Sequence, residues 1–141
     1  MLTPEEAARG SIPERYGREL AVSLSPDGEQ AAVLLETNER PYIYPYLVFC
    51  DRTAEGWTEG SSGSAEGLTW HRTTPIDSPS AAGVVILVGE APNEAQRAVV
   101  AWRSEEKTVP VREGYFLYAE WDVLDSETRD WPRLVRFMYQ S

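Results

Sequence analysis

The pattern of apolar and polar residues predicts strands over most of this chain. Several runs alternate with a period of two, as strands that bury one face do, whereas the run 83–89 is continuously apolar, as strands buried on both faces are. Short runs of this kind follow one another between residues 19 and 140, and clusters of Gly, Pro, Asp and Ser separate them. The run 115–123 shows the alternation most clearly. The side chains expected on its core face are Tyr115, Leu117, Ala119, Trp121 and Val123.

Strands at short, regular spacing without a long helical pattern favour an all-β fold. We predict an antiparallel β-sandwich or a partly open barrel with a short N-terminal helix. The helix is expected because Thr3 precedes Pro4 and stands three residues before Glu6, which is the spacing of a capping box. Residues 1–17 are therefore expected to be a helical segment of one or two short helices.

With 141 residues, the chain is long enough for one domain with a substantial core. We expect a single domain over residues 1–141. Within it, we expect a first sheet over residues 18–73, an internal linker over 74–82 and an immunoglobulin-like second half over 83–141. The linker is placed where two prolines occur and no periodicity is present.

Three further segments carry local signals. Residues 25–28, Ser-Pro-Asp-Gly, have the residue types of a tight turn and predict a hairpin. The glycine- and serine-rich segment 60–67 is expected to be a flexible connection between two strands. Pro110 interrupts the run 107–112, which predicts an edge or bulged strand there.

The chain carries 23 acidic and 13 basic side chains, which gives a formal net charge of −10. The acidity is spread along the chain, and no segment forms a basic patch. Binding of nucleic acid by phosphate neutralisation is therefore disfavoured, and an anionic membrane surface would repel the protein. A basic protein partner is compatible with this charge, as is simple solubility without any partner.

The single cysteine, Cys50, lies in an apolar run, so we expect a buried, unreactive thiol and no intrachain disulfide. The first residues lack the basic and apolar regions of a signal peptide, and the longest apolar run is too short to span a bilayer. The expected location is the cytoplasm.

Residue types that carry catalysis are scarce. The only histidine is His71, and with one cysteine it cannot form a zinc or copper site of several Cys and His ligands. The nearby serines miss the G-x-S-x-G spacing of a hydrolase, and the acidic run 122–130 lacks the residue order of an EF-hand loop. We therefore expect no catalytic residue, no metal and no cofactor. An enzyme that uses carboxylates is the least favoured alternative.

Aromatic residues provide the best candidates for binding. Tyr42, Tyr44 and Tyr46 share one side of an extended segment that Pro41 and Pro45 stiffen. Tyrosines concentrate at interfaces because they bring a large contact area at a small entropic cost. The alternative is that these tyrosines form a structural lid over one end of the core.

Trp131 precedes Pro132 in an acidic loop and is the tryptophan expected to be exposed, whereas Trp102 and Trp121 lie in strands and are expected in the core. We therefore predict a non-catalytic protein that engages a protein partner through an acidic surface with exposed aromatics, as an inhibitor or immunity-type protein does. A basic protein is the partner that the charge favours. The alternative is a domain with an aromatic pocket for a small molecule or carbohydrate. The oligomeric state does not follow from the sequence.

Overall fold

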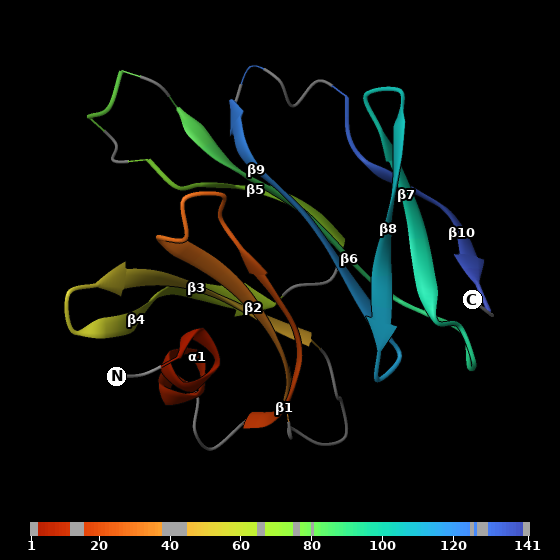
Figure 1. The fold of residues 1–141 in the computed structure, drawn as a ribbon, viewed down its shortest axis with the longest axis horizontal. Helices are drawn as coiled ribbons and strands as arrows, with labels where there is room; N and C mark the ends of the chain where they lie inside the picture. Colours follow the sequence, from red (N-terminus) through yellow and green to blue (C-terminus); the bar gives the residue numbers. More distant parts are fainter. Residues whose placement is uncertain are drawn as a thin grey trace. The chain divides into compact units, whose positions relative to one another are not determined.

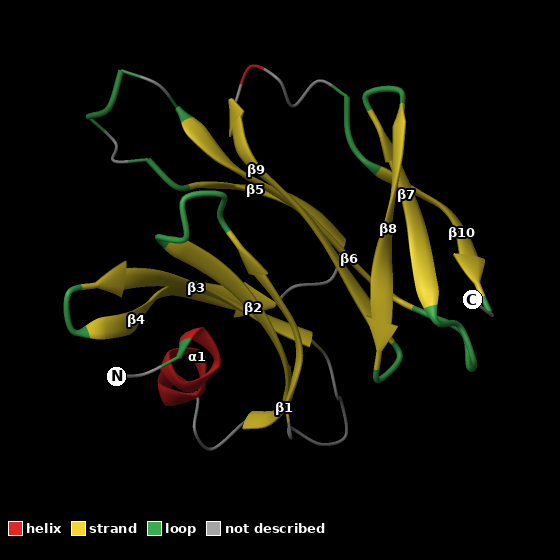
Figure 2. Cartoon of the chain, viewed as in Figure 1, coloured by secondary structure: helices red, strands yellow, loops and turns green. Residues whose placement is uncertain are grey.

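The computed structural model describes residues 3–11, 16–37, 45–64, 67–74, 77–79, 81–124, 126 and 130–139. Strands dominate these residues, and they form a four-stranded and a six-stranded antiparallel sheet (Figure 1). A short helix lies near the N-terminus (Figure 2). The all-β class, the antiparallel pairing and the N-terminal helix expected from the sequence are confirmed.

The chain divides into two compact units, residues 1–66 and residues 67–141, and each unit contains one of the sheets. The division lies between the fourth and fifth strands, not in the segment 74–82 where we expected a linker. That segment joins two strands that pair with each other within one sheet. The expectation that the whole chain forms a single domain stays a prediction.

The first unit is a four-stranded meander covered on one face by a helix. Its elements are α1 (Pro4–Ser11), β1 (Tyr16–Leu24), β2 (Gln30–Thr37), β3 (Pro45–Thr53) and β4 (Gly56–Ser64), and the strands pair in chain order. The helix packs its small side chains against the sheet, so that the backbones approach closely. The buried cluster between them contains Ala7, Ala8, Ala31, Val33, Leu35, Val48 and Cys50. The buried thiol predicted for Cys50 is confirmed.

The predicted capping box begins α1. The Thr3 amide donates a hydrogen bond to Glu6 Oε1 at 3.1 Å, and the Glu6 amide donates one to Thr3 Oγ1 at 3.2 Å. These reciprocal bonds satisfy amides that have no partner inside the helix. The strand β1 already begins at Tyr16, so the helical segment expected over residues 1–17 is too long at its end.

The predicted turn over residues 25–28 joins β1 to β2. The Asp27 carboxylate accepts hydrogen bonds from the Ser25 hydroxyl at 2.6 Å and from the Glu29 amide at 3.0 Å, and these bonds hold the pKa of Asp27 below its usual value. Gly28 adopts a φ of +74°, a conformation that glycine reaches without steric cost.

The segment 60–67, expected to be a flexible connection, is strand as far as Ser64. Residues 62–64 pair with β3, beside a register shift between Val48 and Cys50. A Cβ on Gly60 would lie 3.1 Å from the Phe49 carbonyl oxygen. The expectation is therefore wrong as far as Ser64, because these residues pair with β3 and Gly60 permits close backbone approach at a β-bulge. Residues 65 and 66 lie outside the described residues.

The second unit is one six-stranded sheet that curls into a half-barrel. Its strands are β5 (Gly67–Arg72), β6 (Ala82–Glu90), β7 (Arg97–Trp102), β8 (Glu105–Arg112), β9 (Tyr115–Leu124) and β10 (Arg133–Met138), in the order β5-β6-β9-β8-β7-β10. Ala98 and Val100 of β7 share a buried cluster with Phe116 and Tyr118 of β9, although β8 lies between these strands in the sheet. The core of this unit is therefore the concave side of the curl.

A bulge in β9 changes the face that we expected to be buried. The pairing with β6 shifts by one residue between Val85 and Gly83, and Asp122 adopts a φ of +60°. The core clusters therefore contain the even-numbered Phe116 and Tyr118 and then the odd-numbered Val123. A single alternation cannot describe a strand that contains a bulge.

Replacing Thr3 with Ala should lower the free energy of unfolding by about 1 kcal/mol, because the Glu6 amide loses its side-chain partner. Urea denaturation followed by circular dichroism measures this change. Thr3→Ser keeps the hydroxyl and should stay close to the wild type. Equal destabilisation by both substitutions would contradict a capping role.

Candidate functional site

The strands β8 and β9 diverge after a short paired region, and Pro110 explains where the pairing ends. The two strands pair only through Val111 and Arg112. The Val111 amide donates to the Gln96 carbonyl on the β7 side at 2.9 Å. Successive amides along a strand point to opposite edges, so position 110 faces β9, and proline has no amide hydrogen to donate there. The sequence predicted an edge or bulged strand here, and this prediction is wrong, because β8 pairs with β7 on one side and with β9 on the other and neither pairing has a register shift.

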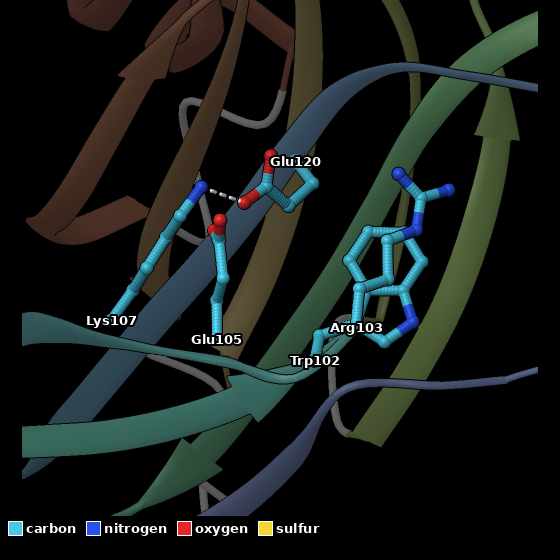
Figure 3. Close-up of a pocket in the computed structure, with 5 residues that line it drawn as sticks. All are labelled: Trp102, Arg103, Glu105, Lys107 and Glu120. Atoms are coloured by element: carbon cyan, nitrogen blue, oxygen red, sulfur yellow. Dashed lines mark hydrogen bonds and ion pairs between the residues drawn. The ribbon is translucent and has the colours of Figure 1, made fainter.

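A polar cleft of about 200 Å³ opens where the strands diverge (Figure 3). The lining residues are Trp102, Arg103, Glu105, Lys107 and Glu120. Lys107 of β8 forms an ion pair with Glu120 of β9. This side-chain link joins the two strands where the backbone ladder between them is absent.

Buried Tyr118 supports the acidic end of this ion pair from below. Its hydroxyl donates a hydrogen bond to Glu120 Oε1 at 2.9 Å. Burial raises the pKa of Tyr118 well above its usual value, and the neighbouring Glu120 raises it further. The hydrogen bond to Glu120 also raises the pKa of Lys107. Both side chains therefore hold their protons near neutral pH, where a general base or an amine nucleophile needs to be deprotonated.

Trp102 and Arg103 form one wall of the cleft. The Trp102 side chain is only 6% exposed, as its predicted core position requires, and its Nε1–H donates to the Asp130 carbonyl oxygen at 2.6 Å. The Arg103 guanidinium carbon lies 4.0 Å from the centre of the Trp102 ring, within the range of a cation–π contact. The stacking directs Arg103 along the wall (Figure 3).

The turn that carries Arg103 is strained. Arg103 and Ser104 have φ values of +54° and +65°, in a two-residue hairpin connection where Asn-Gly is the favoured pair. Left-handed conformations of ordinary residues cost on the order of 1 kcal/mol each. The stacking on Trp102 compensates for part of this cost.

Glu105 and Glu106 are neighbours on β8 and point to opposite faces of the sheet. Glu105 lines the cleft, is exposed, and its side chain makes no hydrogen bond or ion pair with any residue that the structure describes. Glu106 is paired on the other face with Arg136, at 3.4 Å. Glu105 therefore interacts with the cleft only through its charge, which contributes to the raised pKa of Lys107.

Sequence reasoning missed this cleft. The signal was present in the run 105–111, where Glu105 and Lys107 occupy the same face as Val109 and Val111. Charged side chains that continue an apolar stripe, in a strand interrupted by proline, indicate a face that leaves the core. In the sequence analysis, Pro110 indicates only an edge or bulged strand.

The structure describes only one of the three tyrosines in the predicted binding segment. Tyr42 and Tyr44 lie outside the described residues. Tyr46 belongs to β3 and is half-buried, because it packs against the cluster beneath α1. Its predicted part in an interface stays a prediction.

Trp131 is exposed as predicted, with 39% of its surface accessible. It belongs to a short segment with three other exposed apolar side chains, which are Leu134, Val135 and Tyr139. We call these four residues the edge surface, because they lie on or beside β10 at the edge of the six-stranded sheet. Trp121, in contrast, is half-buried and belongs to neither core cluster of this unit.

No family model matches the chain, and neither the curated proteins nor the solved structures give a match. Within the described part of the chain, no helix is long and apolar enough to cross a membrane. The same residues contain no group of three or more His, Cys, Asp or Glu side chains that could hold a metal ion. A function for this chain therefore has to be argued from its own surfaces.

Replacing Pro110 with Val should extend the β8–β9 ladder, because the new amide faces β9. We expect the amide of residue 110 to be protected from hydrogen exchange, as measured by NMR. Thr108→Val changes a side chain in the same strand without adding a donor and should leave the cleft open. An unprotected amide at position 110 would show that another feature separates the strands.

Tyr118 should make the stability of the protein fall at high pH. Its folded pKa is raised, so its contribution is complete below about pH 10 and is lost as the pH rises through the folded value. Tyr118→Phe should therefore reduce the loss of stability above pH 10, measured as the urea midpoint from pH 8 to 11.5. The exposed Tyr139 offers the matched variant Tyr139→Phe, which should follow the wild type. Parallel curves for all three proteins would refute this account.

Proposed function

We propose that this chain is a non-catalytic binding protein that engages a basic protein partner, as an inhibitor or immunity-type protein does. The observation that carries the proposal is the edge surface, where Trp131 and three further apolar side chains are exposed within nine residues. Single exposed apolar residues are ordinary on soluble proteins. Several together beside an open strand edge are typical of a surface that associates.

Trp131 is the expected anchor of this contact. Tryptophan is enriched among the residues that contribute most to binding, because it brings a large apolar area and one polar group. Leu134 and Val135, which follow it closely in the sequence and are also exposed, are proposed as further apolar contacts. Tyr42, Tyr44 and Tyr46 remain part of the proposal as additional contacts.

The charge of the chain supports a basic partner. Residues 1–66 carry 12 acidic and 5 basic side chains, for a net charge of −7, and residues 67–141 carry 11 and 8, for a net charge of −3. In the first unit, exposed carboxylates include Asp27, Glu29, Asp51, Glu55 and Glu59. Such a charge accelerates encounter with a positively charged protein and disfavours nucleic acid and anionic membranes.

The other functions have less support. An aromatic pocket for a small molecule or carbohydrate would need accessible rings, but the cleft is polar and Trp102 is almost completely buried. An enzyme that used Lys107 or Tyr118 as its base would need that side chain deprotonated near neutral pH, and both hold their protons there. We include a cytoplasmic location in the proposal, because a lone buried thiol suits a reducing compartment.

Trp131→Ala should weaken binding of the partner at least about tenfold, since it removes the anchor. The partner would be isolated by cross-linking in native lysate, purified, and its affinity measured by calorimetry. Leu24→Ala, which truncates another exposed apolar residue, should bind as the wild type does. Raising the salt concentration from 0.05 to 0.5 M, a range chosen because it shortens the Debye length from above about 10 Å to below it, should slow association. Unchanged affinity in Trp131→Ala would overturn the proposal.

A further inference from the structure

We propose that the polar cleft of the second unit binds a guanidinium group, supplied by an arginine side chain of the basic partner. Glu105 would bind this group first, and the group would compete with Lys107 for Glu120. The inference rests on the proposed function for the source of the arginine. The site itself rests only on residues of β7, β8 and β9 and on the turn between β7 and β8.

The interactions inside the cleft determine whether it favours a ligand of positive or of negative charge. Lys107 is paired with Glu120, and Arg103 is stacked on Trp102. An anionic ligand would have to withdraw one of these cations from its present partner. A cationic ligand finds Glu105, whose charge acts on nearby Lys107 but whose carboxylate makes no direct hydrogen bond or ion pair with any described residue. The cleft therefore fits a hydrogen-bond donor with a positive charge.

The ion pair between Lys107 and Glu120 is open to exchange. The two side chains are 50% and 25% exposed, and exposed ion pairs contribute at most about 1 kcal/mol to stability. An incoming cation can therefore share or take over Glu120 without a large loss. Lys107 acts in this arrangement as an internal competitor that fills the site when no ligand is present.

The geometry favours a guanidinium over an ammonium group. Figure 3 shows that Glu105 projects from one side of the opening, beside Lys107, and that Glu120 projects from the strand across it. A guanidinium presents five N–H donors in one plane and can bond two carboxylates at once, whereas an ammonium is a compact point charge. Tyr118 fixes Glu120 from below, so the second carboxylate is already oriented.

The test uses the full chain and Nα-acetyl-arginine amide as the probe, titrated while NMR follows the amides of β8 and β9 and the Trp102 indole N–H. We expect saturable shifts at residues of the cleft. Nα-acetyl-glutamine amide, which is neutral, and Nα-acetyl-glutamate amide, which is anionic, should produce none. Shifts with the anionic probe, or none with the arginine probe, would overturn the inference.

Substitutions at two adjacent positions distinguish binding at a defined site from general attraction of a cation to an acidic protein. Glu105→Gln should weaken the arginine probe about tenfold, because it removes a charge-assisted hydrogen bond. Glu106→Gln removes the same charge from the opposite face and should leave the affinity unchanged. Equal effects of the two variants would refute a defined site. Unchanged urea midpoints show that each variant is folded.

Lys107→Gln tests whether Lys107 competes with the ligand, since a cleft without a binding role would show no change in affinity for the probe. Removal of the competitor should raise the affinity of the arginine probe about two- to fivefold, which is the range expected for loss of an exposed ion pair. Weaker binding in this variant would contradict competition. Failure of this inference is distinguishable from failure of the proposed function, because Trp131→Ala tests the partner and leaves the probe unaffected.

Discussion

A missing amide hydrogen at Pro110 governs the architecture of the second unit. An antiparallel ladder continues only while each edge offers donors and acceptors in alternation, and Pro110 removes a donor on the side that faces β9. The ladder between β8 and β9 therefore consists of two residue pairs next to the hairpin turn. Beyond that point the sheet bends, and β7 and β9 meet through their side chains instead. The concave core follows from this early separation.

The same separation exposes part of the concave face, and the residues there are polar. Towards the hairpin, Val109 and Val111 pack with Phe116 in the core. Further along β8, the same stripe continues as Lys107 and Glu105, which reach solvent through the opening. One strand therefore serves as core at one end and as a charged wall at the other. Where the backbone ladder is absent, the ion pair between Lys107 and Glu120 joins the two strands, and the Tyr118 hydroxyl donates to the same carboxylate.

The sequence predicted the features that depend on local chemistry. The cap formed by Thr3 and Glu6, the turn around Gly28 and the exposure of Trp131 follow from residue types at fixed spacing, and the structure contains all three. Prediction from the sequence failed where a backbone irregularity changes which side chains of a strand face the core. The bulge at Asp122 moves Val123 to the other face of the strand. The alternation of residue types along that strand does not predict this bulge.

The candidate sites differ in the same way. Exposure of Trp131 could be foreseen because proline and acidic neighbours surround it in the sequence. The cleft required the positions of two strands that meet only in three dimensions, since Glu120 comes from β9 and Glu105 from β8. The division between the units could not be predicted from the sequence either, because the Gly- and Ser-rich residues of β4 resemble a loop in composition.

The turn of Arg103 and Ser104 has a consequence for how this chain can change over evolutionary time. Glycine or asparagine at either position would relieve backbone strain, so selection for stability alone would favour such replacements. At position 103, either replacement would also shorten or remove a side chain that lines the cleft. Drift towards stability and retention of this wall therefore act in opposite directions at position 103, whereas Ser104 does not line the cleft. Across related chains, the amino acid at position 103 would record which of the two pressures prevailed.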